Sequence, residues 1–228
     1  MAGLPRFHRV ALDCGTGNGQ AARGLAAYFD RVIAIDASPE QIAHAQPHAR
    51  IEYRVARADA SGLPDKSVDL VTVAQALHWL DPQSFFAEAK RVLDPGGAIA
   101  VWGYADPVLD KPELQQILHR FNRGTIESYW LPERQLVLDG YATVPFPFDE
   151  IPTPGFTLSR ECTLEELIGY VRSWSATARC VADHGTAEVE RLESELSRHW
   201  GDPSGRHRVD APLYIRAGRP ATKFSGNR

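Results

Sequence analysis

The sequence LDCGTGNGQ, at residues 12–20, lies between an apolar run typical of a strand and a run typical of a helix. Its three glycines, Gly15, Gly17 and Gly19, occupy alternate positions. Because glycine has no Cβ atom, its backbone can approach a ligand closely and adopt conformations that other residues avoid. The stretch therefore predicts a loop that binds a nucleotide-like cofactor. The alternative is a strand-to-helix turn that needs the glycines for its geometry alone.

The spacing of these glycines distinguishes between two kinds of cofactor. Dinucleotide-binding loops follow the pattern G-x-G-x-x-G, in which the second glycine admits a pyrophosphate and the third lets the helix pack on the strand. Here the third glycine comes one residue early, and Gln20 takes its place. Asp13 puts a carboxylate beside the loop, where it would repel a pyrophosphate. S-adenosylmethionine, which carries an ammonium, a sulfonium and a ribose diol but no phosphate, suits the loop better.

The composition is typical of one soluble domain. With 228 residues, a net charge of −4 and 43% hydrophobic residues, the chain can bury one large core with a small appended lobe. No apolar run reaches the length of a membrane span or a signal peptide, and the mild acidity argues against nucleic acid as a partner. The three cysteines are scattered and form no C-x-x-C pair, which argues against a disulfide framework or a zinc site. We expect a cytoplasmic protein, monomeric or weakly dimeric.

Strand-like and helix-like segments alternate along the first hundred residues. The regular alternation predicts an α/β fold with a doubly wound, mostly parallel sheet. Ser38 and Gln41 form a capping box that opens one helix, and Asp94-Pro95-Gly96-Gly97 is typical of a turn. The expected strands cover residues 10–13, 32–36, 51–55, 68–74 and 98–104.

The alternation stops after Tyr104, which indicates a different organisation in the rest of the chain. Prolines and aromatic residues follow, and then a capping box, Thr163 with Glu166, opens a further helix. Residues 206–217 are expected to form a closing strand. The predicted organisation is a cofactor-binding half at 1–105, an inserted helical cap at 106–150, C-terminal helices and closing strands of the same domain at 151–217, and a flexible tail at 218–228.

Carboxylates stand at or just after the ends of the first three predicted strands. In a doubly wound sheet these ends meet at one cleft, where the ligand binds. Asp36 would then accept hydrogen bonds from the two ribose hydroxyls, Asp59 from the adenine amino group, and Asp13 would face the ammonium. The alternative for each is a helix cap, since Asp often precedes a helix.

The chain resembles the class I S-adenosylmethionine-dependent methyltransferases, and within them the branch similar to trans-aconitate methyltransferase. The resemblance rests on residues 13–19 (DCGTGNG), 35–38 (IDAS), 74–79 (AQALHW) and 91–97 (RVLDPGG). It implies a Rossmann-like sheet of seven strands whose last strand is antiparallel. It also implies helices ahead of the first strand that fold over the cofactor, whereas nine residues precede Val10 here. The cofactor-binding residues expected on this basis are Asp13, Cys14, Gly15, Thr16, Gly17, Gly19, Asp36, Ala37, Asp59, Ala60, Ala74 and Gln75.

Methyl transfer from a sulfonium is an in-line displacement that needs alignment more than it needs a base. A carboxylate acceptor needs no base, whereas a hydroxyl or an amine would gain from one. His78 is the best-placed base, with a pocket-wall or packing histidine as the alternative. Gln75 could orient the acceptor or simply satisfy backbone groups. Arg172 and Arg179, seven residues apart on one expected helix, could clamp an anionic substrate or be solvated. The candidate substrate-binding residues are His78, Trp79, Tyr104, Trp130, Arg172 and Arg179.

Some motifs are missing from the sequence. No Asn/Asp-Pro-Pro-Tyr/Phe motif follows the fourth strand, which argues against methylation of nucleic-acid bases or glutamine. Clustered acidic ligands are also missing, and His44 and His48 lack a third ligand, so we expect no metal. The expected function is methylation of a small-molecule acceptor, with a carboxylate as the candidate group. Two alternatives are a non-catalytic S-adenosylmethionine-binding protein and an NAD(P)-dependent oxidoreductase.

Overall fold

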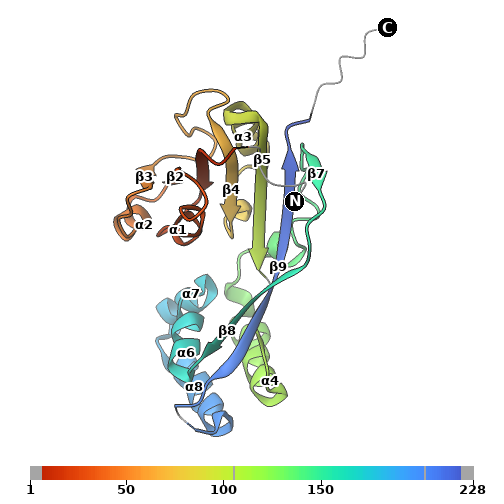
Figure 1. Ribbon diagram of the computed structural model, residues 1–228. Helices are drawn as coiled ribbons and strands as arrows, with labels where there is room; N and C mark the ends of the chain where they lie inside the picture. The colour runs from red at the N-terminus through yellow and green to blue at the C-terminus, as the bar shows by residue number, and fades with distance from the viewer. Residues whose placement is uncertain (1–6, 105, 203, 222–228) are drawn as a thin grey trace. The chain divides into compact units, whose positions relative to one another are not determined.

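The computed structural model describes residues 7–104, 106–202 and 204–221 (Figure 1). These residues divide into two compact units. The first unit falls within Met1–Tyr104, Leu136–Gly155 and Tyr214–Arg228, and the second within Ala105–Gln135 and Phe156–Leu213.

A parallel sheet forms the centre of the first unit. Its strands follow the spatial order β3-β2-β1-β4-β5, and each pair of neighbours in this series is parallel. The order reverses beside β1, because β2 and β4 flank it on opposite sides, and ligands bind at the carboxyl ends of strands around such a point. The predicted doubly wound α/β fold is therefore confirmed. The strands are β1 (Val10–Cys14), β2 (Arg31–Asp36), β3 (Ile51–Val55), β4 (Val68–Ala74) and β5 (Leu93–Tyr104).

Apolar side chains cover both faces of this sheet, as the continuous apolar runs of its strands require. On one face the sheet packs against Phe85, Phe86 and Val92 of α3 (Pro82–Val92). On the other face Ala22 of α1 (Gln20–Leu25) packs with Phe29 and with strand residues of β1 and β2.

Two helices of the first unit begin as their sequences predict. Ser38 caps α2 (Pro39–Ala43) by accepting a hydrogen bond from the Gln41 backbone N–H at 3.2 Å. In the expected capping box the Gln41 side chain would accept from the Ser38 N–H, but this N–H donates to Asp36 Oδ1 instead, at 2.9 Å. Asp81, which follows the 3₁₀ turn η1 (Leu77–Trp79), caps α3 through the Ser84 N–H at 2.9 Å.

The antiparallel end of the sheet is more elaborate than the sequence predicts. β9 (His207–Arg219) lies next to β5, and in the first unit its end pairs antiparallel with β7 (Asp149–Ile151). In the second unit β9 pairs antiparallel with β6 (Val108–Leu109) and β8 (Phe156–Cys162). The described part of the chain thus has nine strands where seven were expected, because the long β9 offers pairing positions to three short segments.

The expected turn at residues 94–97 is wrong, because β5 already begins at Leu93. The pairing of β4 with β5 shifts register between Val68 and Leu70, so the Pro-Gly-Gly sequence forms an irregularity inside the strand. A Cβ atom at Gly97 would lie 2.9 Å from the Asp69 carbonyl oxygen. Glycine is therefore needed here because the backbones of β4 and β5 approach each other closely.

Helices with their own apolar core make up most of the second unit. Side chains of α4 (Pro112–Arg120), α6 (Leu164–Arg172) and α8 (Ala187–Trp200) pack together, among them Leu114, Leu167 and Leu196. Thr163 and Glu166 form the predicted capping box at the start of α6, with hydrogen bonds of 3.3 and 2.9 Å. The elements are α4 (Pro112–Arg120), the π-helical turn η2 (Phe121–Thr125), the 3₁₀ turn η3 (Glu127–Tyr129), α6 (Leu164–Arg172), α7 (Ser175–His184) and α8 (Ala187–Trp200).

These two units differ from the predicted domain boundaries. The predicted cap at 106–150 is divided within α5 (Arg134–Leu138), since Val137, Tyr141 and Phe148 pack into the core of the parallel sheet. The helices between residues 164 and 200 have a core of their own and belong to the second unit. Gly218 and Arg219, expected in the tail, belong to β9, and residues 222–228 lie outside the described residues. None of the helices in the described ranges has the length and apolar character that a membrane span requires.

Candidate functional site

The glycine loop connects β1 to α1 and has the backbone that its sequence predicts. Gly15, Gly17 and Gly19 all have positive φ angles, of 64°, 57° and 91°. A Cβ atom at Gly15 would lie 2.7 Å from the Cβ atom of Ala76, and one at Gly19 would collide with the Tyr53 ring. The glycines therefore allow both the left-handed backbone and the close approach of the loop to the chain after β4.

Asp36, the last residue of β2, joins this loop to the next helix. Its Oδ2 accepts a hydrogen bond from the Gly17 N–H and its Oδ1 one from the Ser38 N–H, each at 2.9 Å. A carboxylate oxygen can accept a second hydrogen bond, so each oxygen retains capacity for one ribose hydroxyl. The geometry fits the predicted role, and it shows that Asp36 also fixes the loop.

Asp13 is placed differently from its predicted role. Its side chain is fully buried, and its two oxygens accept hydrogen bonds from the hydroxyls of Thr16 at 2.6 Å and Thr72 at 2.7 Å. Burial raises the pKa of Asp13 to about 6, although the two hydroxyls oppose the shift. The expected direct contact with the cofactor ammonium is therefore not supported, and the carboxylate instead links the glycine loop to β4.

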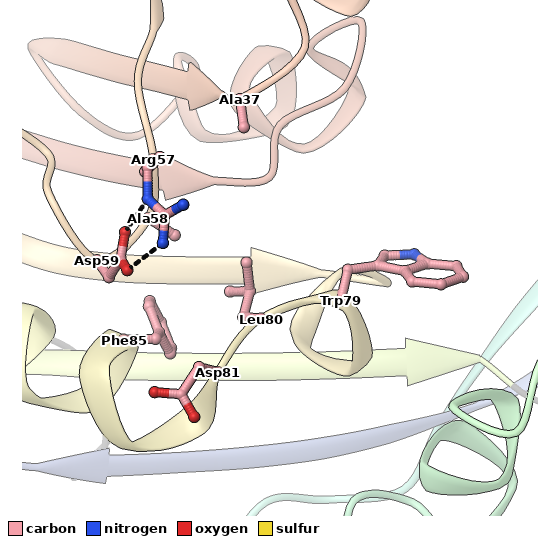
Figure 2. A pocket seen from close by; sticks show the side chains of 8 residues that line it. All are labelled: Ala37, Arg57, Ala58, Asp59, Trp79, Leu80, Asp81 and Phe85. Atoms are coloured by element: carbon pink, nitrogen blue, oxygen red, sulfur yellow. Dashed lines mark hydrogen bonds and ion pairs between the residues drawn. The ribbon is translucent and has the colours of Figure 1, made fainter.

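A small cavity of about 150 Å³ opens beside the ends of β2 and β3 (Figure 2). Ala37 and Asp59 were predicted from the sequence, whereas Ala60, the neighbour of Asp59, does not line the cavity. Figure 2 shows the Trp79 ring extending away from the other lining side chains, and Trp79 is 53% exposed. The lining residues are Ala37, Arg57, Ala58, Asp59, Trp79, Leu80, Asp81 and Phe85.

Two carboxylates give this cavity its polar character. Asp59 forms a two-pronged ion pair with Arg57, with N–O distances of 2.9 and 2.6 Å, and this guanidinium lowers the pKa of Asp59. Hydrogen bonds from Ser84 lower the pKa of Asp81. Both groups are therefore ionised at neutral pH and can accept from an amino group such as that of adenine. No group of three or more metal-ligating side chains occurs within the described ranges.

The residue after β4, Gln75, has a strained backbone. Its φ angle is 52°, a left-handed conformation that costs a non-glycine residue about 1–3 kcal/mol. Its N–H donates to the Trp102 carbonyl at 2.8 Å, and its Oε1 accepts from the Tyr104 N–H at 2.9 Å. Of the two roles considered for Gln75, the structure shows that its side-chain oxygen satisfies a backbone group. Ala74, the last residue of β4, precedes it directly.

His78 lies in η1, and its partner was not found from the sequence. Its Nδ1 is 3.1 Å from the hydroxyl of Tyr141, and its ring lies 4.6 Å from that of Trp79. Tyr141 is fully buried and follows Asp139 and Gly140, a pair typical of a turn, which is the only local signal in its sequence. Burial raises the pKa of the Tyr104 phenol.

The other three candidate substrate residues belong to the second unit. Trp130 donates to Asn122 at 2.9 Å and carries the Arg134 guanidinium 3.9 Å above its ring. Arg172 lies 3.8 Å from a Glu193 carboxylate oxygen, and Arg179 donates to the Tyr129 carbonyl at 3.1 Å. The prediction that both arginines share one helix is wrong, because α6 ends at Arg172 and α7 begins at Ser175. The structure therefore gives no support to the anion clamp.

Comparisons with known proteins agree with this geometry. A family model described as a methyltransferase domain matches residues 12–101. A protein of Dictyostelium discoideum, proposed to be a methyltransferase, is 31% identical over 90% of this chain and 80% of its own length. An uncharacterized methyltransferase of Mycobacterium tuberculosis is 32% identical over 86% of this chain and 76% of its own length.

A solved structure supports the same assignment. It comes from Anaeromyxobacter dehalogenans, is proposed to be a type II methyltransferase, and is 39% identical with a TM-score of 0.87. The match covers 96% of this chain and 93% of the other. A glycine loop without a dinucleotide spacing, a carboxylate that can bind a diol and a small cavity with acidic edges all suit the same cofactor. The chain belongs to the class I S-adenosylmethionine-dependent methyltransferases.

Proposed function

We propose that this methyltransferase transfers the methyl group of S-adenosylmethionine to a carboxylate of a small molecule and so forms a methyl ester. One observation carries this proposal: both candidate catalytic side chains already use a hydrogen-bonding atom within the protein. Gln75 Oε1 accepts from Tyr104, and His78 Nδ1 contacts Tyr141. A carboxylate is already a nucleophile and needs no base. It therefore suits a site in which Gln75 Oε1 and His78 Nδ1 are engaged in hydrogen bonds within the protein.

The residues of the first unit would hold the cofactor in a fixed orientation. Asp36 would bind the ribose hydroxyls, the cavity edged by Asp59 and Asp81 would hold the adenine, and the glycine loop with Ala74 would hold the methionine portion. When bound, S-adenosylmethionine supplies a methyl group on a sulfonium. Alignment of acceptor and methyl group can then provide much of the rate, since well-oriented reactions gain roughly 7–11 kcal/mol.

We assign the chain to the branch similar to trans-aconitate methyltransferase, on residues 74–79 and 91–97. We further propose that it acts in the cytoplasm as a monomer or weak homodimer, without a nucleic-acid partner. The three cysteines are unpaired and buried, which fits a reducing compartment. Sedimentation at several protein concentrations would measure the oligomeric state.

A screen of acceptors tests the proposal. Small carboxylic acids, phenols and amines are incubated with the enzyme and labelled cofactor, and the products are analysed by mass and by their lability in alkali. We expect base-labile methyl esters from at least one class of acid. Methylation of phenols or amines in the absence of any ester product would contradict the proposal. Asp36→Ala is the control, because it should abolish the signal by weakening cofactor binding.

A further inference from the structure

The turn that carries Tyr141 is held firmly by the rest of the first unit. Gly140 and Tyr141 both have left-handed backbones, with φ angles of 60° and 57°. The Tyr141 N–H donates to the Leu136 carbonyl at 2.7 Å, and its own carbonyl accepts from Arg216 at 2.8 Å. The same guanidinium nitrogen of Arg216 donates to the Val144 carbonyl at 2.6 Å. A strained residue persists where its surroundings fix it in this way, and such residues cluster at functional sites.

The position of the Tyr141 ring is equally constrained. A Cβ atom at Gly103 of β5 would lie 3.2 Å from the ring, so the glycine leaves the space that the phenol occupies. The hydroxyl is thereby presented to His78, with 3.1 Å between Oη and Nδ1. The two aromatic rings are nearly parallel, at 19°.

The phenol of Tyr141 is able to donate this hydrogen bond. Burial raises the pKa of Tyr141, and the neighbouring Tyr104 adds to the shift, so the hydroxyl keeps its proton at neutral pH. A hydrogen bond from the His78 backbone N–H opposes the shift, which means that the phenol oxygen already serves as an acceptor. Its proton then needs an acceptor, and within the described residues it meets Nδ1 of His78.

We propose that Tyr141 is a positioning residue whose hydroxyl donates to Nδ1 of His78 and fixes the neutral imidazole with its proton on Nε2. In this form Nε2 carries the proton and the lone pair of Nδ1 is occupied by the hydrogen bond from Tyr141, so neither ring nitrogen is available to remove a proton. His78 then acts as a hydrogen-bond donor and not as a general base. This inference deepens the proposed function and rests on it for the choice of acceptor, because such a site favours a group that is already anionic.

Nitrogen NMR of the wild-type enzyme tests the tautomer directly. The imidazole signals are recorded above the titration range of histidine, and His78→Gln identifies those of His78. We expect a protonated, pyrrole-like Nε2 and an unprotonated, pyridine-like Nδ1. A protonated Nδ1 with a pyridine-like Nε2 would overturn the proposal, and this result needs no variant of Tyr141.

Tyr141→Phe shows whether the phenol hydroxyl determines the tautomer of His78. In this variant we expect the Nδ1 signal of His78 to move, because the hydrogen-bond donor is lost. Tyr53→Phe is the control: it removes a buried hydroxyl that has no hydrogen-bond partner, and it should leave the His78 signal in place. With a carboxylic acid as acceptor, Tyr141→Phe should lower kcat about three- to tenfold, as for the loss of one hydrogen bond, and leave KM for the cofactor within about twofold. An Nδ1 signal unchanged in Tyr141→Phe would also overturn the proposal.

The two proposals fail in different ways. If no acid is methylated but Nε2 of His78 is protonated, the proposed function is wrong and the tautomer assignment stands. If acids are methylated but Nδ1 carries the proton, the role of Tyr141 is wrong and the proposed function stands.

Discussion

The glycine loop of the first unit and the helices of the second unit use their polar residues in different ways. In the loop, backbone N–H groups and threonine hydroxyls hold the carboxylates of Asp36 and Asp13. In the second unit Arg172 faces Glu193 and Arg179 binds a backbone carbonyl. The two carboxylates of the loop are held around one turn, whereas the two arginines lie on different helices and have unrelated partners. Cofactor binding is thus the more sharply specified of the two functions.

Loss of Asp36 should have the largest effect of the changes considered, because it weakens cofactor binding at the loop. Asp36→Ala removes two charge-assisted acceptors for the ribose, each contributing roughly 1.5–3 kcal/mol, so affinity for S-adenosylhomocysteine should fall about 10²- to 10⁴-fold. Asp59→Ala removes one acceptor and should cost about 10- to 150-fold. Titration calorimetry measures both. Arg172→Ala, in the second unit, is the control and should leave the affinity unchanged. An Asp36 variant that folds and binds normally would refute its role.

The buried carboxylate of Asp13 makes stability depend on pH. Its folded pKa of about 6 lies above the unfolded value of about 3.9, so the unfolded state loses this proton first as the pH rises. The contribution of Asp13 is therefore fully present below about pH 4 and decreases by about 3 kcal/mol as the pH passes 6. Asp13→Asn lacks this dependence.

Urea unfolding of wild type and Asp13→Asn at several pH values measures the difference. Relative to the variant, the wild type should lose stability between about pH 4 and 7. A stability difference that is constant over this range would show that the carboxyl group is not held in a desolvated site.

Binding of the cofactor product should stabilise the protein by a measurable amount. At about one hundred times its dissociation constant, S-adenosylhomocysteine adds about 2.7 kcal/mol, which raises the melting temperature by roughly 5–11 °C for a domain of this size. NAD and NADP should give no shift, because the glycine spacing does not suit a pyrophosphate. Differential scanning fluorimetry compares the three ligands, and a shift with NAD alone would overturn the cofactor assignment.

The smallest effect is expected at His78. With a carboxylic acid as acceptor no proton leaves, so His78→Ala should reduce turnover less than about tenfold, compared with the 10²- to 10⁴-fold typical of a lost general base. The wild-type rate should also show no rise near an unperturbed imidazole pKa of roughly 6.5. Rate profiles against pH for both proteins decide the question. An imidazole-like rise that disappears in the variant would establish His78 as the base.

The strands and the glycine loop of the first unit could be predicted from the sequence because their signals are local. Gly15, Gly17 and Gly19 follow a strand directly, and Asp36 ends the next strand, so neighbouring residues suffice to place them. Tyr141 lies 63 residues from His78, and no periodicity or motif connects the two. Backbone pairing also overrides local propensity at residues 94–97, where a turn-like sequence continues as a strand. Ser173 and Trp174 separate two helices that the apolar pattern alone joins.

The hydrogen bonds from Arg216 to Tyr141 and Val144 have a consequence for the order of folding. Arg216 lies near the end of β9, so the turn that presents Tyr141 receives these bonds only after the ribosome has made the chain as far as this strand. The glycine loop, by contrast, needs β1, β2 and β4, all complete by Ala74. During synthesis, therefore, the parts of the fold that hold the cofactor precede the completed surroundings of His78. The bonds that hold the turn of Tyr141 thus depend on β9, whereas the hydrogen bonds of Asp13 and Asp36 at the glycine loop do not involve this strand.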